Sequence, residues 1–257
     1  MQRAAAADML IKFRNALLSL LGVVAVWWAV AASGWINPEL FPTPYAVWQA
    51  AVELYQEGLL LSDLRISLAR AAVGFAIGST LGVAVGLLTA RTRLFSLALN
   101  PFLSLLRPIP AIALVPLAIV WFGIGEPSKF FVISYTVFLA VWLNTHHGME
   151  HIAITYIRAS RCLGTTRLRE FFEVVIPAAA PHIVAGLRMG AALAFLSLVA
   201  AELTGASAGI GFRLQEARQF IRTDRMFVGL IELGLLGALL DLVFVMLSRK
   251  LVHWEHL

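Results

Sequence analysis

Two histidines flank a glutamate in the stretch His147-Gly148-Met149-Glu150-His151, which has the H-x-x-E-H spacing of inverted zinc proteases. Residues four apart share one face of a helix, so His147 and His151 have the spacing of two ligands for one zinc ion. Gly148 weakens the helix that would hold them, and no third ligand motif follows in the sequence. An intramembrane zinc metalloprotease is therefore one alternative function. The other interpretation is a polar helix end.

Charged residues inside apolar segments are the next candidates for chemistry. Each costs roughly 2.5–3.5 kcal/mol at the centre of a bilayer, so each needs a polar cavity, a partner charge or the membrane edge. For Arg70 and Arg107 the membrane edge is one of these alternatives, because a long arginine side chain can reach an interface. Arg188 and Glu202 lie fourteen residues apart on one segment, about 21 Å along a helix, and therefore cannot pair with each other. We expect both on the substrate path or its gate, together with Arg213, Arg218 and Arg222 of the loop between Gly209 and Arg225. This loop would contact the binding protein or gate the substrate, and a solvated helix face is the alternative interpretation of its arginines.

The chain has no sequence that would bind the phosphates of ATP. Its three lysines are Lys12, Lys129 and Lys250, and none completes the Gly-Lys-Ser/Thr of a phosphate-binding loop. The single cysteine, Cys162, excludes an internal disulfide and any multi-cysteine zinc or iron–sulfur site. We therefore expect no cofactor on this chain. If ATP drives its activity, ATP and magnesium must bind to a partner subunit.

The elements that position these residues are membrane spans. Apolar residues make up 60% of the 257 residues and charged residues 14%, too little polar surface for a water-soluble globule. Uncharged runs of about twenty residues match the thickness of a bilayer. A cleaved signal peptide is the alternative for the first run. The sequence predicts an all-α polytopic bundle with about six spans, at 16–35, 66–90, within 94–122, 130–149, 181–203 and 226–248.

Basic residues in the short loops give the orientation, because they concentrate on the cytoplasmic side. The exception is the loop 204–225, which is basic but would lie outside. With both termini inside, most of the remaining basic residues fall on the inner side. This set comprises Arg3, Lys12, Arg14, Arg91, Arg93, Arg158, Arg161, Arg167, Arg169, Arg249 and Lys250. The net charge of +5 is thus mainly a matter of topology, and nucleic acid is not an expected partner.

Two connections and one glycine pattern carry further information. Residues 43–57 place Val47, Ala50, Ala51 and Leu54 on one helical face and predict an amphipathic helix on the outer surface. The inner loop 150–181 predicts a short helix that ends at Gly164 and a second from about Thr166 that ends before Pro177. Glycines at every fourth position allow another helix to approach closely, within the chain or across a dimer. They are Gly74, Gly78, Gly82 and Gly86.

The inner loop resembles the EAA motif of bacterial ABC importer permeases. The positions that fit are Ala159, Leu163-Gly164, Phe171, Val174, Pro177 and Pro181. From about Asp63 to the C-terminus, further motifs resemble the nitrate/sulfonate/taurine branch of that family. They include Pro108-Ile109-Pro110, residues 116–126, Leu143-Asn144-Thr145, Ala201-Glu202, 207–211 and 215–224.

The resemblance implies a permease of the type I importer fold in the bacterial inner membrane. It implies residues 1–62 as an N-terminal span with an outer amphipathic helix, and 63–257 as the permease core with its coupling loop at 150–181. The implied partners are a second copy of the chain, two cytoplasmic ATP-binding subunits, an extracytoplasmic solute-binding protein and the lipid bilayer. The solute would be a small anion such as nitrate, a sulfonate or taurine. An ion-coupled carrier working alone is a further alternative.

In that family the loop docks onto the ATP-binding subunit. The residues implied for this contact are Arg158, Ala159, Ser160, Arg161, Leu163, Gly164, Thr165, Leu168 and Arg169. One position departs from the family pattern, because Arg158 stands where the motif normally begins with an acid. We therefore expect an acidic or neutral residue opposite Arg158 on the partner.

Overall fold

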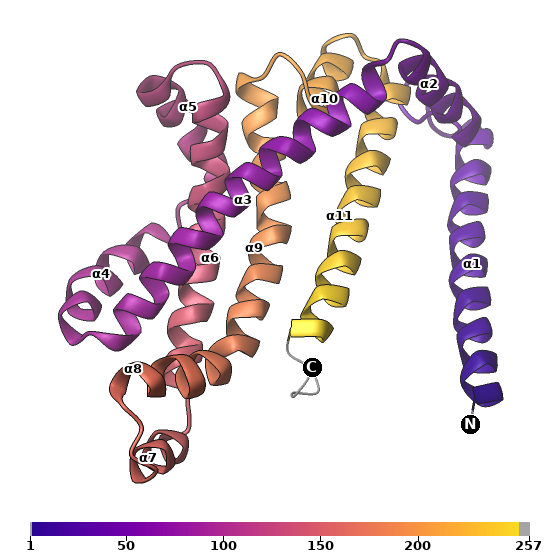
Figure 1. The fold of residues 1–257 in the computed structure, drawn as a ribbon. Helices are drawn as coiled ribbons and strands as arrows, with labels where there is room; N and C mark the ends of the chain where they lie inside the picture. The colour runs from indigo at the N-terminus through magenta and orange to yellow at the C-terminus, as the bar shows by residue number, and fades with distance from the viewer. Residues whose placement is uncertain (1, 252–257) are drawn as a thin grey trace. The chain divides into compact units, whose positions relative to one another are not determined.

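The structure is a computed structural model that describes the backbone of residues 2–251 and the side chains of 14–15, 18–246 and 248. The basic side chains Arg3, Lys12, Arg249 and Lys250 lie outside this described set. Within it every regular element is helical (Figure 1). The elements are α1 (Gln2–Ala32), α2 (Pro44–Gln56), α3 (Leu59–Arg91), α4 (Arg93–Leu106), α5 (Ala111–Phe122), α6 (Glu126–Glu150), α7 (Ile154–Cys162), α8 (Arg167–Glu170), the π-helical turn η1 (Phe171–Val175), α9 (Ile176–Gly205), α10 (Ile210–Gln219) and α11 (Thr223–Leu251).

The all-α membrane fold expected from composition is confirmed. Four described helices are long and apolar enough to cross a bilayer: α3, α6, the continuous helix Arg167–Gly205, and Thr223–Met246 of α11. Helices α4 and α5 are long and apolar enough to cross a bilayer only as a pair, and a bend of 104° separates them. In the first expected span, Leu18–Ala32 is a shorter apolar helix.

Contacts divide the chain into two compact units. The first holds the chain up to Leu61 together with Arg213–Ile231, and the second holds Ser62–Phe212 and the chain from Glu232 onward. Residues 213–231 thus group with the N-terminal segment, although the sequence division at residue 62 placed them in the permease core. Each unit is described separately below.

In the first unit, α2 packs its apolar face as the sequence predicts. Val47, Ala50 and Leu54 are buried and form a cluster with Val228. The side-chain oxygen of Thr43 accepts a hydrogen bond from the Ala46 amide and caps the helix. The cluster extends to Trp27 of α1, which stacks on Phe227 with ring centroids 5.4 Å apart. Aromatic packing therefore joins α1, α2 and the start of α11.

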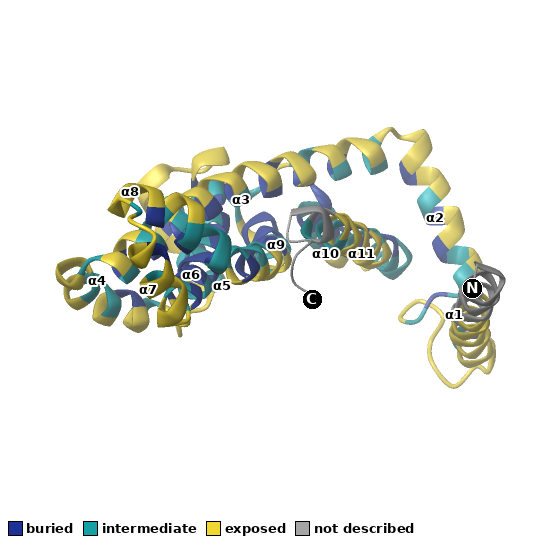
Figure 2. Cartoon of the chain, turned by 60° about the horizontal axis from the view of Figure 1, so that its bottom comes forward, coloured by how far each residue is buried: buried dark blue, intermediate teal, exposed yellow. Residues whose placement is uncertain are grey.

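The core of the second unit is the packing of α6 against α9, with α5 in contact with both. The buried residues of its main cluster are Ala71, Ile133, Val137, Val141, Ala194 and Leu198. In Figure 2 the buried positions of α6 and α9 lie on the sides where these helices meet. Small residues on α9 and β-branched residues on α6 bring the two helices together, as is usual for packing in membranes.

The four-residue glycine pattern of α3 lies directly on α6. A Cβ added to Gly78 would come 2.5 Å from the carbonyl oxygen of Ser134, and one added to Gly82 would come 2.8 Å from the Cβ of Val141. Gly74 and Gly86 face Ile133 and Thr145 in the same way. The structure thus gives these glycines a packing role within the chain, the first of the two interpretations that the sequence left open.

The chain between Arg167 and Gly205 differs from the sequence prediction. The second helix of the inner loop was expected to end before Pro177, but the helix continues through it. Pro177 is the second residue of α9 and directly follows the π-helical turn η1, so the bond that its missing amide hydrogen cannot make falls where the α-helical pattern is already altered. In the turn before it, the Ile176 amide donates to the Phe171 carbonyl, a π-helical bond that widens the helix.

Candidate functional site

The turn between α7 and α8 forms a hairpin that is held by its own polar groups. Gly164 adopts a left-handed φ of +76° and ends α7, as the sequence predicts. The amide and hydroxyl of Thr165 both donate to the carbonyl of Ser160, at 3.2 and 2.7 Å. Arg161 donates through Nε to the buried carboxylate of Glu170 at 2.8 Å, and this bond raises the pKa of Arg161. The hairpin is therefore a preformed element.

The outer surface of this hairpin is apolar and exposed. Leu163 is 83% exposed and Leu168 is 70% exposed. Arg158, Ala159 and Arg169 are exposed beside them, whereas Ser160 is buried and Thr165 is half-buried. Exposed apolar residues on a preformed surface indicate a docking site for another protein. The structure thus brings the sequence-predicted coupling residues together in one element, with Ser160 inside it.

A second polar group lies in the second unit, between α3, the start of α6 and the end of α9. The buried guanidinium of Arg70 donates to Glu126 through Nε and Nη2, at 2.8 and 2.6 Å, and to Glu202 through Nη1 at 2.7 Å. Lys129, also buried, donates to the same Glu126 at 2.9 Å. Of the surroundings that the sequence left open for Arg70, the structure shows a partner charge, because two carboxylates compensate its guanidinium.

Glu202 belongs to the same cluster and also holds a loop. It accepts hydrogen bonds from the Ser67 hydroxyl and from the Gly211 amide, each at 2.9 Å. The Gly209 amide donates to Asp63 at 2.8 Å, and Gly209 has a φ of +115° that favours glycine. Glu202 is only 1% exposed. Its oxygens are thus engaged in fixing the segment after α9, which argues against a direct substrate contact.

Arg188 and Asp241 form the other ion pair of this unit. Nε and Nη2 of Arg188, on α9, donate to the two carboxylate oxygens of Asp241, on α11, at 2.7 and 2.9 Å. The side chains are 51% and 54% exposed, although both lie within apolar helices. This pair borders a cavity of about 340 Å³ whose other lining residues are apolar. Of the expected path residues, Arg188 is the one that the structure places at a cavity in this unit.

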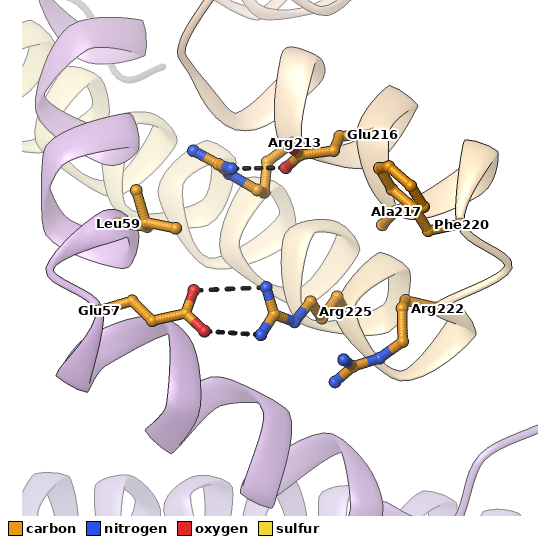
Figure 3. A pocket seen from close by; sticks show the side chains of 8 residues that line it. All are labelled: Glu57, Leu59, Arg213, Glu216, Ala217, Phe220, Arg222 and Arg225. Atoms are coloured by element: carbon orange, nitrogen blue, oxygen red, sulfur yellow. Dashed lines mark hydrogen bonds and ion pairs between the residues drawn. The ribbon is translucent and has the colours of Figure 1, made fainter.

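The other expected path residues, Arg213, Arg218 and Arg222, lie in the first unit. Arg213 and Arg222 line an open cavity of about 520 Å³ together with Glu57, Arg225 and apolar neighbours (Figure 3). Arg225 pairs with Glu57 at 2.8 Å, and Asp224 and Glu53 raise the pKa of Arg222 through hydrogen bonds. The arginines are balanced by acids, so this cavity is polar without being strongly cationic. Arg218 is exposed on α10.

The histidines at 146–151 are engaged in hydrogen bonds of the helix end. His146 is buried and lies 3.0 Å from the Thr89 hydroxyl and 3.1 Å from the Asn100 amide nitrogen. Nδ1 of His151 lies 2.7 Å from the His147 carbonyl. In the part of the chain that the structure describes, no three His, Cys, Asp or Glu side chains group as a metal site. The zinc protease alternative thus has no support.

The sequence analysis missed three buried polar residues of the Arg70 cluster: Asp63, Ser67 and Lys129. A signal was present on α3. Asp63, Ser67 and Arg70 lie four and three residues apart, so they continue the face of the glycine pattern that begins at Gly74. Polar residues on the packing face of an apolar helix indicate a buried polar cluster, because that face does not meet water.

Residues 78–253 match the family described as binding-protein-dependent transport system inner membrane component. The chain is 36% identical over 234 residues to the aliphatic sulfonates transport permease protein SsuC of Bacillus subtilis, which covers 91% of this chain and 85% of that protein. It is 32% identical to the taurine permease TauC of Escherichia coli (92% and 88%) and 32% identical to the nitrate permease NrtB of Synechocystis (91% and 88%).

Solved structures share the fold. An inward-facing MetNI methionine ABC transporter chain aligns with a TM-score of 0.65 at 20% identity, over 75% of this chain and 95% of that one. A chain of an amino acid ABC transporter aligns with a TM-score of 0.62 at 17% identity, over 80% and 98%. Family match, relatives and apolar helices agree: this chain belongs to the family of binding-protein-dependent transport system inner membrane components, and is a multi-pass inner-membrane ABC transporter permease of the nitrate/sulfonate/taurine branch.

Proposed function

We propose that this chain is the membrane subunit of an ATP-driven importer for a small anion that a binding protein delivers. Two copies would line one path, and two cytoplasmic ATP-binding subunits would dock on the α7–α8 hairpins. The observation that carries the proposal is this hairpin, which is internally bonded while Leu163 and Leu168 are exposed. An element of this kind is suited to transmit a push from a partner.

The connection from the hairpin to the spans supports this role. From Arg167 the helix runs without interruption through η1 into α9, so a displacement of the hairpin moves the inner end of a membrane span. Arg91 at the end of α3 lies over the ring of Phe171, 4.8 Å from its centroid, and links a second span to the same turn. ATP binding by the cytoplasmic subunits would thus move the spans against one another. Such motion exposes a central site to each side of the membrane in turn, which is alternating access.

The solute class rests on the relatives, which are named for aliphatic sulfonates, taurine and nitrate. All of these carry an oxyanion, and Arg188 at a cavity of the second unit is suited to such a group. The chain itself has no ATP-binding motif. We therefore expect the chain alone in liposomes to transport nothing, and the complex with its ATP-binding subunits to transport only with ATP.

The test is purification of the tagged chain from native membranes, with the co-purified ATP-binding subunit measured by mass spectrometry. Leu163→Asp combined with Leu168→Asp should abolish co-purification, since it places two charges in the contact. Trp35→Asp makes the same change at a residue that is 92% exposed outside the hairpin, and should leave co-purification intact. Retention of the ATP-binding subunit by the double variant, or transport by the chain alone, would contradict the proposal.

Arg158 sharpens the same test. The EAA motif normally begins with an acidic residue, and this chain has Arg158 at that position. The residue of the partner that faces Arg158 should therefore be acidic or neutral. Arg158→Glu should then lower transport-coupled ATP hydrolysis with the native partner, because it introduces repulsion or removes an attraction. A rise in coupled hydrolysis would show that the contact still has the ordinary charge pattern of the motif.

A further inference from the structure

The side chains of the Arg188–Asp241 pair are half exposed, although both residues lie well within apolar helices. Arg188 lies twelve residues after the start of α9 and seventeen before its end, about 18 and 25 Å along the axis. Asp241 lies ten residues before the end of α11, about 15 Å. Charges at such depth are costly against lipid, yet both side chains are about half exposed. The pair must therefore face a polar space.

The space beside the pair is a cleft with apolar walls. The cavity of about 340 Å³ is lined by Ala192, Phe195, Leu240 and Phe244 next to Arg188 and Asp241. A smaller cavity of about 150 Å³ shares Phe195, Leu240 and Phe244 with it and extends towards α3. Small-molecule sites commonly have about 300–1,000 Å³ and mostly apolar walls with a few convergent polar groups. One charged end and one apolar end define the shape of the expected occupant.

The pair leaves hydrogen-bond donors available. A guanidinium has five N–H groups, and Asp241 engages Nε and one hydrogen of Nη2 of Arg188. Asp241 thereby fixes the plane of the guanidinium, while Nη1 and the second hydrogen of Nη2 remain for a ligand. An oxyanion with several acceptor oxygens is the group that such a fork binds best.

From this geometry we propose that the cleft between α9 and α11 is the site where the permease holds its solute during passage, and that the solute is an organic sulfonate. The sulfonate oxygens bind the open side of the Arg188 guanidinium, and the aliphatic segment lies against Phe195, Leu240 and Phe244. Asp241 is a positioning residue that also limits affinity, since its charge repels the anion. Weak holding suits a site from which the solute must leave. This inference rests on the proposed transport function and adds a site and a ligand class to it.

The test begins with water access to the cleft. The chain has one cysteine, the exposed Cys162, so Cys162→Ser gives a background free of thiols. Ala192→Cys then places a thiol on the cleft wall, and Leu239→Cys places one on α11 outside the cavity lining. Both variants are tested in the complex purified from native membranes and placed in nanodiscs. A cationic methanethiosulfonate should modify Ala192→Cys at least about tenfold faster than Leu239→Cys. Equal rates would mean that the cleft holds no water, and would overturn the proposal.

Protection identifies the ligand. Hexanesulfonate should slow the modification of Ala192→Cys in a saturable way and leave Leu239→Cys unaffected. Nitrate at equal ionic strength should protect far less, because it lacks the apolar segment. Equal protection by nitrate would overturn the sulfonate assignment, and absence of protection by hexanesulfonate would overturn the site.

Variants of the pair separate binding from packing. Arg188→Gln should weaken protection about tenfold or more, since charge-assisted bonds are lost. Asp241→Asn should strengthen it about three- to tenfold, because a repulsive charge disappears while Arg188 stays. A pair that merely joined two helices would show no gain with Asp241→Asn. Arg107→Gln, at a separate cavity between α5 and α6, is the matched control and should leave protection unchanged.

The outcome can be told apart from failure of the proposed function. ATP-dependent uptake that persists in the complex while hexanesulfonate gives no protection would overturn this site and leave the importer function intact. Loss of the ATP-binding partner, by contrast, would affect the proposed function and not the protection measured at Ala192→Cys.

Discussion

Two arginines in apolar helices of the second unit have opposite surroundings. Arg70 is bound by Glu126 and Glu202 and its side chain is 6% exposed. Arg188 is bound by Asp241 alone and its side chain is 51% exposed. The residue types are the same, and both pairs lie within apolar helices. The difference is in the number of partners and in the access of solvent, and it separates a charge that supports the fold from one that is available to a ligand.

The physical reason lies in desolvation. A buried ion pair has already lost its water, so removal of one member leaves an uncompensated charge. A half-exposed pair keeps water or a polar ligand on its open side, and its loss costs little. The following predictions test this contrast, beginning with the largest expected effect.

Glu202→Ala should destabilise the chain by about 3–5 kcal/mol, because it leaves the buried guanidinium of Arg70 with one carboxylate and the Gly211 amide without an acceptor. Thermal unfolding in detergent measures this loss. Glu202→Gln keeps hydrogen-bonding groups at the same place and should recover part of it. An unfolding temperature equal to that of the parent chain would show that the Arg70 cluster does not stabilise the fold.

Gly78→Ala should cost about 1–3 kcal/mol, because a Cβ there would come 2.5 Å from the Ser134 carbonyl oxygen of α6. Gly234→Ala on α11 is the matched control, since a Cβ there has no atom within 4 Å and alanine favours a helix. The two variants should therefore shift the unfolding temperature in opposite directions. Equal shifts would show that α3 does not depend on close approach to α6.

Asp241→Asn should leave the unfolding temperature close to that of the parent chain, as expected for a pair whose side chains are half exposed. The same thermal measurement on the same preparation allows direct comparison with Glu202→Ala. A loss of stability as large as that of Glu202→Ala would mean that both ion pairs support the fold equally, which would contradict the contrast between them.

Glu53 in the first unit gives the smallest effect, and it depends on pH. Hydrogen bonds from Arg222 and Arg225 lower the pKa of Glu53 below its ordinary value of 4.5. A lowered folded-state pKa stabilises the fold above that ordinary value, and the contribution disappears as the pH falls through the folded pKa. Glu53→Gln should therefore flatten the acid-side loss of stability below pH 4.5 in a series of unfolding curves. An identical acid profile in both chains would show that these bonds contribute nothing.

Much of this arrangement could be predicted from the sequence. Apolar runs predicted the helices, the spacing of Val47, Ala50 and Leu54 predicted the buried face of α2, and Gly164 predicted the end of α7. These features depend on local chemistry: helical periodicity, bilayer thickness and the left-handed conformation that glycine adopts. The motifs that resemble the EAA permeases likewise led to the family, which the comparisons confirmed.

Other features required knowledge of which helices meet. A helix was predicted to end before Pro177, but a π-helical turn precedes this proline and the helix continues through it. For Arg70 the sequence left a polar cavity, a partner charge and the membrane edge open, and the structure shows the partner charges Glu126 and Glu202, which are 56 and 132 residues away in sequence. A long arginine at an apolar helix allows each of these outcomes, and only the neighbouring helices decide.

By itself the sequence determined that this chain is helical and that it belongs in a membrane. These properties follow from residue types and from spacing along one helix. The tertiary structure alone decided that Arg70 and Glu202 are engaged in the fold while Arg188 and Asp241 border a cleft. The reason is that a charge within an apolar helix must find a polar partner, and the identity of that partner is set by packing between segments far apart in the chain.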